Sequence, residues 1–546
     1  MTENGPQSTE FNYSKRQILF GVISIFAVYS SVIYSIQSVN IARPKMAAEL
    51  DGMSLYHWAV SIPALFSAFA TLIFGKFSDM YGRRIMLMTA LAVSFVGTVL
   101  CAVSPGFTFL IVASAIAAIG NGAITPLTFS VVGDLFPPEK RGKWIGLLNV
   151  PAGVFSLIGP ALGGWFVDSP ALGWRWLYWV SLPLLVVCLL TTPIGVPSIR
   201  SAKRGKIDVK GCILVAVALS ATIVGLSFAG DRYAWNSWQI ISFLLLALIF
   251  WVLFIRAENH AEEPFLDPVV FRNRSFLTIA ASSFLVSFGQ MGMMMYFVMY
   301  LQGVQLNNDF ERFLEPIGRV LGFSVGNATI SGIIVTPMSL VMAFISVPVG
   351  FMMGKMKNFK WMYVVGYGIL VAVMFGVILL DQDSSQWLSV AAAALAGVGL
   401  GAIPPLNTMV VQTAVPQKLL GVAMGAFFFC FLIGVAVSPA VLGSAMNSTY
   451  KTALTASIPE ELMTGDFLET VGNSRVLLSQ KDMDDLEADL AKNGQTALFP
   501  RTVNAIRDSL AAGVRTVFWI SAVTMLMAFI LICTLGNHRK PKNQDL

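Results

Sequence analysis

The sequence contains few charged residues. Asp, Glu, Lys and Arg make up 12% of its 546 residues, whereas hydrophobic residues make up 56%. The mean hydropathy is +0.72. A water-soluble protein of this length could not cover its surface with so few charges. The composition therefore excludes an ordinary soluble protein and predicts that a lipid bilayer surrounds most of the chain.

Residues that carry enzyme chemistry are also few. The three histidines lie far apart in the sequence, and the five cysteines lie in apolar stretches without the spacing of metal ligands. No segment matches the phosphate-binding loop GxxxxGK[ST]. We therefore expect no enzyme, no metal and no cofactor. Nucleic acid is not an expected partner, because the formal charge of +6 comes from Lys and Arg placed between apolar segments.

Apolar runs recur along the chain, and each is long enough to cross a hydrocarbon core about 30 Å thick. The polar start, residues 1–14, does not resemble a cleavable signal peptide, so the first run is expected to remain as a span. The sequence predicts an all-α membrane protein with fourteen spans, near residues 18–44, 54–75, 85–104, 107–133, 143–167, 174–196, 211–229, 236–256, 275–303, 328–354, 361–380, 386–413, 419–446 and 513–536.

Loop charges predict the orientation of these spans. Lys and Arg concentrate after the second, fourth, sixth and tenth runs, whereas the other loops are nearly uncharged or acidic, as at Asp381 and Asp383. Both chain ends are basic. Because positive loops stay in the cytoplasm, we predict a monomer in the plasma membrane or bacterial inner membrane, with both termini cytoplasmic.

An internal repeat divides the chain. Gly122-Ala-Ile-Thr-Pro126-Leu corresponds to Gly401-Ala-Ile-Pro-Pro405-Leu at a fixed offset (405 − 126 = 279). At this offset further Gly and Pro residues coincide, among them Gly142 with Gly421. Gly and Pro determine backbone shape, so the two halves should share their helix bends. Two homologous helical halves around a midplane cavity are typical of a secondary transporter.

The repeat predicts the domain organisation. Residues 1–200 form a six-helix bundle, residues 201–262 add two helices, and residues 263–546 form a second six-helix bundle. Residues 447–512 are polar, and we expect a small external helical or hairpin element there.

The most specific motif is Gly75-Lys-Phe-Ser-Asp79-Met-Tyr-Gly82-Arg83-Arg84, between the second and third spans. A tight turn needs its glycines, and Asp79 can cap the next helix and pair with a cation. Basic residues that only fix topology would not explain the Gly, Asp and Gly spacing. This stretch resembles the signature loop of the major facilitator superfamily.

A second motif, Asp134-Leu-Phe-Pro-Pro-Glu-Lys-Arg141-Gly142, ends the fourth span. It resembles the matching loop of the fourteen-helix drug:proton antiporter group. The resemblance implies a latch that joins Asp79 to cations of this loop, Arg141 first. Closing the latch would shut the cytoplasmic side.

A third motif lies in the fifth span and consists of Gly153 followed by Gly159-Pro160-Ala-Leu-Gly163-Gly164. Small residues allow close helix approach, and proline kinks the helix. The stretch resembles the antiporter motif of drug exporters, and ordinary small-residue packing is the alternative. Together with the other two motifs it favours export, and the resemblance covers nearly the whole chain.

The sequence departs from this group in its first and fourth spans. Such exporters usually carry an acidic residue in span one where this chain has Ser35, and an arginine in span four where it has Ile116. No Asp or Glu lies deep in a predicted span. An acid in the bilayer is costly, about 2.5–3.5 kcal/mol on insertion scales, and normally marks proton handling.

Three interpretations of the missing acid stay open. A carboxylate at the membrane edge couples to protons, with Asp134, Asp168 or Asp79 as candidates. Alternatively, Asp381 or Asp383 lies deeper than the hydropathy indicates. Alternatively, transport is uncoupled and follows the substrate gradient.

Without buried charge, the predicted cavity would be lined by neutral amides and soft apolar groups. Buried amides are costly unless they are paired or wet, and methionine adapts to varied apolar partners. For each residue, helix packing is the alternative role. The candidate cavity residues are Gln37, Asn40, Asn121, Asn149, Gln290, Met294 and Asn407.

These features predict an exporter of hydrophobic or amphipathic small molecules that works by alternating access, as a multidrug-type pump whose proton coupling the sequence leaves undecided. The main alternative is a carrier for one neutral or lipid-like metabolite, which the missing acids favour. A receptor without transport activity is a weaker alternative, because it would not need a moving gate.

Overall fold

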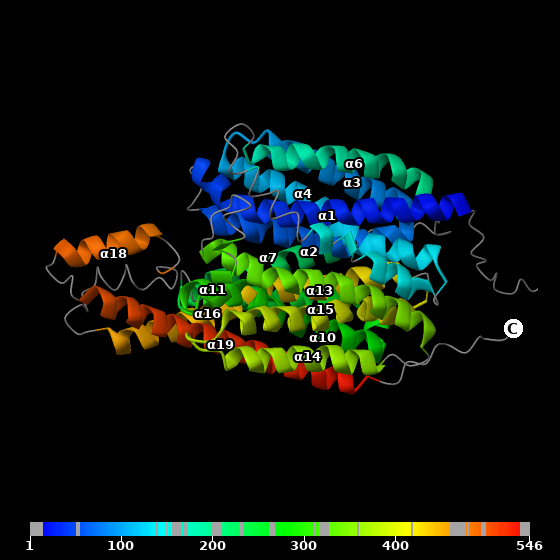
Figure 1. The fold of residues 1–546 in the computed structure, drawn as a ribbon. Helices are drawn as coiled ribbons and strands as arrows, with labels where there is room; N and C mark the ends of the chain where they lie inside the picture. The colour runs from blue at the N-terminus through cyan, green and yellow to red at the C-terminus, as the bar shows by residue number, and fades with distance from the viewer. Residues whose placement is uncertain are drawn as a thin grey trace, which may run out of the picture.

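The computed structural model describes residues 15–50, 55–137, 140–148, 150–151, 153–155, 166, 173–197, 209–229, 233–260, 268–310, 312–313, 315–316, 327–356, 360–416, 419–458, 477, 480–492 and 498–535. Almost all of these residues are helical, and one isolated bridge pairs Ala229 with Tyr233. The long helices run side by side in one elongated bundle (Figure 1).

The helix bounds follow the apolar runs, because in lipid every backbone polar group has to be paired within its own helix. In chain order the helices are α1 (Lys15–Glu49), α2 (Tyr56–Tyr81), α3 (Arg83–Ala102), α4 (Phe107–Leu135), α6 (Arg175–Gly195), α7 (Val209–Phe228), α8 (Trp238–Glu258), α9 (Pro268–Arg272), α10 (Arg274–Met291), η2 (Gly292–Tyr296), α11 (Phe297–Gly303), α13 (Asn327–Lys355), α14 (Lys360–Ile378), α15 (Gln386–Ala414), α16 (Leu420–Ser457), α18 (Gln480–Lys492) and α19 (Phe499–Cys533).

The prediction of an all-helical membrane protein is confirmed. Within the described ranges, eleven helices are long and apolar enough to cross a membrane. The count of fourteen spans stays a prediction, because α2 is not among the eleven, the apolar part of the seventh predicted span is a shorter helix at Lys210–Leu226, and part of the fifth lies outside the described residues. Residues 143–148 of that span are helical.

The helices pack as two groups that meet along α2, α4 and α16. Helices α1, α2, α3, α4 and α6 contact one another, and so do α10, α13, α14, α15, α16 and α19. Helix α2 packs along α16, and α4 also contacts α16. The division of the chain at residues 200 and 262 agrees with this grouping but stays a prediction.

The two additional central helices lie against this junction. Helix α7 packs on α8 and contacts both α2 and α16. Leu72 of α2, Leu219 of α7, Phe254 of α8 and Phe429 of α16 belong to one buried apolar cluster. The pair α7–α8 therefore touches both groups of helices at the place where they meet.

The expected external segment is shorter than its predicted bounds of 447–512. Helix α16 continues to Ser457 and α19 begins at Phe499, so both ends of the segment belong to long helices. A hydropathy-based prediction ends a span where polar residues begin. A helix can nevertheless continue beyond the bilayer into water when it packs on neighbouring helices. Between them, α18 buries Leu486 and Leu490, and it projects from one end of the bundle (Figure 1).

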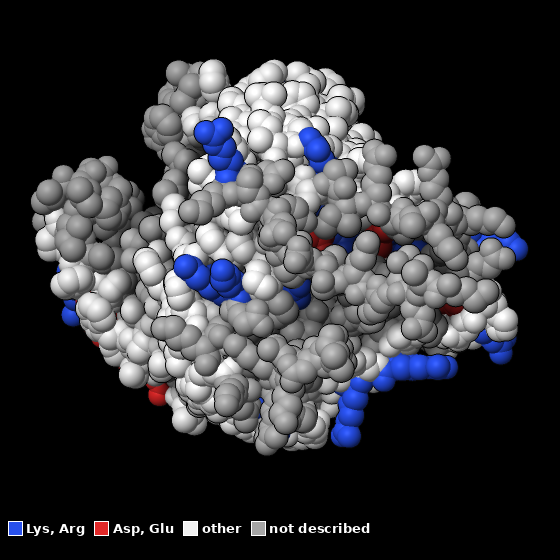
Figure 2. Space-filling model, turned by 90° about the vertical axis from the view of Figure 1, so that its right-hand side faces the viewer, with Lys and Arg blue, Asp and Glu red and all other residues white. Residues whose placement is uncertain are grey.

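The bundle has two distinct ends. Helix α1 begins and α19 finishes at the same end, which we call the terminal end, whereas α18 lies at the opposite, far end (Figure 1). Lys360, at the start of α14, donates a hydrogen bond of 2.7 Å to the carbonyl of Cys533 and ties α14 to the end of α19. Figure 2 looks onto the terminal end, where Lys and Arg are scattered over the described surface and Asp and Glu are few.

Candidate functional site

A tight turn at the terminal end joins α2 to α3. Gly82 lies between the two helices with φ = 96°, a conformation that L side chains rarely adopt and that glycine adopts without strain. The turn leaves Asp79 in the last turn of α2 and Arg83 at the first position of α3. The two side chains are therefore four residues apart and face each other.

Arg83 occupies the centre of a buried charged cluster. Its Nη1 pairs with Asp79 and donates a bond of 2.6 Å to Ser78 Oγ, and its Nε donates to Asp134 Oδ2 at 3.0 Å. The side chains of Arg83, Asp79 and Asp134 are 7%, 9% and 5% exposed. Charges so far from water are stable only when paired and hydrogen-bonded, which makes the three residues interdependent.

The carboxylate of Asp79 also reaches the other group of helices. Its oxygens accept hydrogen bonds of 2.9 Å from the amide of Gly421 and 2.6 Å from the amide of Val422. These amides lie in the first turn of α16, where backbone N–H groups have no partner within the helix and the helix dipole is positive. Asp79 therefore caps α16, whereas the sequence predicted that it would cap the helix that follows it.

We call Asp79, Arg83, Asp134 and the amides of Gly421 and Val422 the Arg83 cluster. The sequence predicted that Arg141 would be the first cation to pair with Asp79, whereas in the structure Arg83 makes this ion pair. Arg141 is instead buried beside the cluster and donates to the carbonyls of Phe136 at 2.9 Å and Gly133 at 2.7 Å. It thereby holds the end of α4 in place. Arg84 of the same motif is half-buried.

Glycines bring the two groups of helices into backbone contact beside the cluster. A Cβ on Gly75 would lie 2.8 Å from the carbonyl oxygen of Gly421, and one on Gly425 would lie 3.0 Å from the carbonyl oxygen of Thr71. A side chain at either position would separate α2 from α16.

The repeat places an equivalent contact elsewhere at this end. A Cβ on Gly146 would lie 3.2 Å from the Cα of Gly350, and Gly146 and Gly350 correspond to Gly425 and Thr71 at the offset of 279. Gly142 likewise lies against Gly350, with 2.8 Å between its added Cβ and that carbonyl oxygen. The two groups of helices therefore meet in two contacts related by the repeat.

Two further contacts extend this junction. Gln412 of α15 donates a bond of 2.9 Å to the carbonyl of Phe129 in α4, and the rings of Phe129 and Phe428 are stacked with centroids 5.4 Å apart. Gly153, the first residue of the third motif, lies against Ala343 of α13. The other proposed residues of that region, Gly159, Pro160, Gly163, Gly164 and Asp168, lie outside the described residues.

The candidate cavity residues have different surroundings. Asn121 accepts a bond of 2.8 Å from Ser94, so it joins α4 to α3. Asn407 is buried and donates to Ser283 of α10 at 2.9 Å, while its Oδ1 has no hydrogen-bond partner among the described residues. The side chains of Gln37, Asn40 and Asn149 lie outside the described residues.

Gln290 and Met294 lie together where α10 changes into the π-helical turn η2. Gln290 Nε2 is 3.8 Å from Met294 Sδ, and Met294 is exposed. On α10, Gln290 follows Ser283 and Ser287, which contact α15 and α16, and the turn η2 packs on α19. Single π-helical turns are rare and frequently occur at functional sites.

Comparison with known proteins gives the family. The profile described as "Major Facilitator Superfamily" matches residues 23–439, which is most of the chain. The chain belongs to the Major Facilitator Superfamily. It is therefore an integral membrane transporter and not an enzyme, as its sequence predicted.

Curated relatives in this superfamily include two proteins of Bacillus subtilis (strain 168). The chain is 30% identical to "Multidrug transporter protein MdtP" over 448 residues, which cover 82% of this chain and 78% of that protein. It is 25% identical to "Multidrug resistance protein 3" over 506 residues, 92% of each chain.

Solved structures of the superfamily share the fold. The proton:xylose symporter XylE aligns with a TM-score of 0.57 over 96% of both chains at 12% identity. The human organic anion transporter MFSD10 aligns with a TM-score of 0.56 over 94% of this chain and 99% of that chain, at 14% identity.

Replacing the central arginine should destabilise the described conformation. In Arg83→Gln, two buried carboxylates lose their cation, and the expected loss is about 3–5 kcal/mol. We expect a clearly lower thermal unfolding temperature for the purified protein. Arg84→Gln, a change of the neighbouring half-buried arginine, is the control and should shift it little. Equal shifts in the two variants would contradict the central position of Arg83.

A side chain at Gly425 should open the terminal end. In Gly425→Leu the side chain meets Thr71 and Gly75, and overpacking of this kind costs about 1–3 kcal/mol. The readout is alkylation of a cysteine placed at the buried Leu420, with the native cysteines replaced by serine.

We expect alkylation to be about tenfold faster in Gly425→Leu. In Gly332→Leu, where an added Cβ meets nothing within 4 Å, the rate should not change. An unchanged rate in both variants would mean that the contact of Gly425 with α2 does not close this end.

Proposed function

We propose that this protein is a multidrug-type efflux transporter, which exports hydrophobic or amphipathic small molecules by alternating access between its two groups of helices. The relatives named as multidrug transporters, similar over most of their length, support this proposal. They also favour broad efflux over the alternative of a carrier for one metabolite. We further place the chain, as a monomer, in the fourteen-helix drug:proton antiporter group.

We propose that the terminal end is cytoplasmic. Basic residues prevail on the described surface at this end (Figure 2), and loops rich in Lys and Arg remain in the cytoplasm. Asp381, Asp383 and Asp508 lie toward the far end, around the connection of α14 to α15 and the early turns of α19. Both termini would then be cytoplasmic and α18 external.

The Arg83 cluster serves in this proposal as the latch of the cytoplasmic gate. The single observation that carries it is the Asp79 carboxylate of α2 bound to the first amides of α16. Access from the cytoplasm requires α2 and α16 to separate, and that movement breaks both bonds. Hydrogen bonds to charged groups contribute about 1.5–3 kcal/mol each, enough to bias an equilibrium between two conformations by roughly 10- to 150-fold.

We propose that protons act through the two carboxylates of this latch, Asp79 and Asp134. Both are held by one guanidinium, and Lys76 and Arg141 are also buried close by. A proton on Asp79 would remove the charge that the α16 amides stabilise and would weaken the closed gate. In an exchange of an entering proton for a leaving substrate, the protonated protein must open toward the cytoplasm. A gate that opens when Asp79 takes up a proton meets this requirement. The third candidate acid, Asp168, lies outside the described residues.

Gln290 and Met294 are proposed to contact the substrate. They combine an amide with a flexible thioether, and Met294 is 39% exposed. A site without charge suits neutral and zwitterionic amphiphiles, because an unpaired cation is unfavourable in a low dielectric. Methionine would adapt to substrates of different shapes.

Transport assays in liposomes test the export mechanism. The purified protein should move a labelled neutral or zwitterionic amphiphile, and the rate should rise with an imposed pH gradient. Asp79→Asn should reduce the rate about tenfold or more, because a neutral amide binds the α16 amides less well than a carboxylate. It should also make the rate insensitive to the gradient.

Two results would contradict separate parts of the proposal. Flux in the wild type that ignores the pH gradient would exclude proton coupling at the latch. Absence of flux for every amphiphile, with folded and monodisperse protein, would exclude multidrug efflux.

Substitution at Met294 should change substrate preference without abolishing transport. Met294→Ala is expected to raise the half-saturating concentration about three- to tenfold for bulky substrates, from the loss of apolar contact. Met295→Ala is the matched control, since Met295 is the next residue and is 44% exposed. Competition between two dyes of different size measures the effect. Identical profiles for the two variants would place Met294 against lipid instead.

A further inference from the structure

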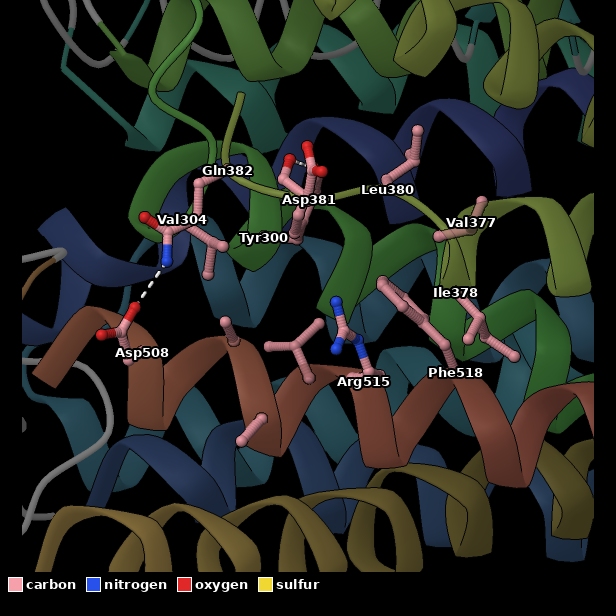
Figure 3. A pocket seen from close by; sticks show the side chains of 13 residues that line it. Tyr300, Val304, Val377, Ile378, Leu380, Asp381, Gln382, Asp508, Arg515 and Phe518 are labelled. Atoms are coloured by element: carbon pink, nitrogen blue, oxygen red, sulfur yellow. Dashed lines mark hydrogen bonds between the residues drawn. The ribbon is translucent and has the colours of Figure 1, made fainter. Parts of the chain in front are cut away.

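A pocket of about 250 Å³ lies at the far end of the second group of helices, apart from the gate and from Gln290 and Met294. It lies between the end of α11, the connection from α14 to α15, and α19 (Figure 3). Its lining residues are Tyr300, Val304, Val377, Ile378, Leu380, Asp381, Gln382, Asp508, Ala511, Ala512, Val514, Arg515 and Phe518. We call it the far-end pocket.

Hydrogen bonds fix one side of the far-end pocket. Tyr300 donates a bond of 2.6 Å to the carbonyl of Asp381, and Ser384 donates to the carboxylate of Asp381 at 2.8 Å. Gln382 Nε2 donates to Asp508 Oδ1 at 2.5 Å, which joins the connection to α19 (Figure 3). Two carboxylates are thus held at the pocket.

Arg515 provides the cation of the far-end pocket. Its guanidinium points from α19 toward Tyr300 and Asp381 (Figure 3). Among the described residues Arg515 makes no ion pair, and its side chain is exposed. An arginine that reaches into a pocket without an ion-pair partner is available to an anionic group such as a phosphate, which it can bind with two parallel hydrogen bonds.

The rest of the wall is apolar. Phe518 of α19 lies near Ile378 at the end of α14 (Figure 3), and Val514 and Leu380 also line the pocket. The pocket thus has charged residues beside apolar residues, so it fits an amphipathic molecule with a charged group next to a hydrocarbon chain.

The depth of the pocket can be counted along two helices. Lys360 of α14 and Cys533 of α19 are hydrogen-bonded at the terminal end. From there, Ile378 is 18 residues along α14 (378 − 360 = 18) and Arg515 is 18 residues along α19 (533 − 515 = 18). A rise of 1.5 Å per residue gives about 27 Å, close to the thickness of the hydrocarbon core. The far-end pocket therefore lies at the level of the phospholipid headgroups.

The surface beside the pocket supports this depth. Trp519 is 49% exposed and packs edge-to-face on Phe375, and Leu379 is 82% exposed. Exposed tryptophan is enriched where the membrane meets water, and exposed leucine at this level faces lipid. In a membrane, lipid would therefore lie next to the far-end pocket.

We propose that the far-end pocket binds the headgroup of a zwitterionic phospholipid that carries a primary ammonium, the ethanolamine type. Arg515 binds the phosphate, Asp381 and Asp508 accept hydrogen bonds from the ammonium, and Val514 and Phe518 contact the start of an acyl chain. Two carboxylates disfavour a net anionic headgroup. A quaternary ammonium cannot donate hydrogen bonds to them, so choline headgroups bind less well.

The test is lipid retention by the purified full-length protein, measured by native mass spectrometry after incubation with equal amounts of three phospholipids. We expect ethanolamine lipid to be retained about tenfold more than choline or glycerol lipid. Arg515→Gln should lower the retention of all three lipids about tenfold, because they share the phosphate that Arg515 binds, whereas Asp508→Asn should abolish the preference for ethanolamine lipid. Arg507→Gln is the matched control, because Arg507 lies two turns away on α19 and outside the pocket, and should leave both the retention and the preference unchanged.

Several outcomes would overturn the proposal. Preference for the anionic glycerol lipid, or equal retention of all three lipids, contradicts the recognition of the ammonium. Unchanged lipid retention in Arg515→Gln contradicts the site. Competition by free glycerophosphoethanolamine at the same concentration as the lipid would show that the pocket takes a soluble ligand rather than a membrane lipid. If Arg515→Gln does not fold, Asp508→Asn tests the site by itself, and an unchanged preference for ethanolamine lipid in that variant contradicts the proposal.

Discussion

The contact of one carboxylate with the start of one helix determines how the two groups of helices meet in this structure. Asp79 lies on α2, but two of its hydrogen bonds go to backbone amides of α16, which is more than 300 residues later in the chain (421 − 79 = 342). Arg83 and Asp134 hold this carboxylate in its orientation, and the positive end of α16 compensates its charge. Because the contact is made by charge and backbone amides, it can be broken and made again as the helices move.

Glycine makes this arrangement possible. The carboxylate reaches α16 only because Gly75, Gly421 and Gly425 allow the two backbones to approach within a few ångströms. The repeat provides the same close approach at Gly146 and Gly350, but not the same charges. At the offset of 279, Arg83 corresponds to Met362 and Asp134 to Thr413. The two related contacts thus share their packing, whereas the charged cluster belongs to only one of them.

The same division between packing and charge applies to the rest of the molecule. Along the spans, close helix contacts and a few paired amides such as Asn407 hold the helices together. Charged side chains appear at the two levels where helices leave the hydrocarbon, around Arg83 at one end and around Arg515 at the other. A charge at either level can be hydrated, paired or bound to lipid, whereas one in the middle of the bilayer is costly unless it is paired or faces a water-filled cavity. In the described part of the chain, the charged clusters therefore lie at the two ends, and the transport path is expected to be neutral.

The sequence by itself determined the class of the protein, the path of the helices and the importance of the stretch from Gly75 to Arg84. Apolar length, loop charge and glycine spacing are local properties, and they act in the same way whatever the rest of the chain does. Only the tertiary structure decided that Asp79 pairs with Arg83 and caps α16, that Arg141 binds carbonyls of α4, and that Arg515 enters a pocket with Asp381 and Asp508. Each of these choices depends on which helix ends come together in space, and a carboxylate or guanidinium has several possible partners until packing brings one of them within hydrogen-bond distance.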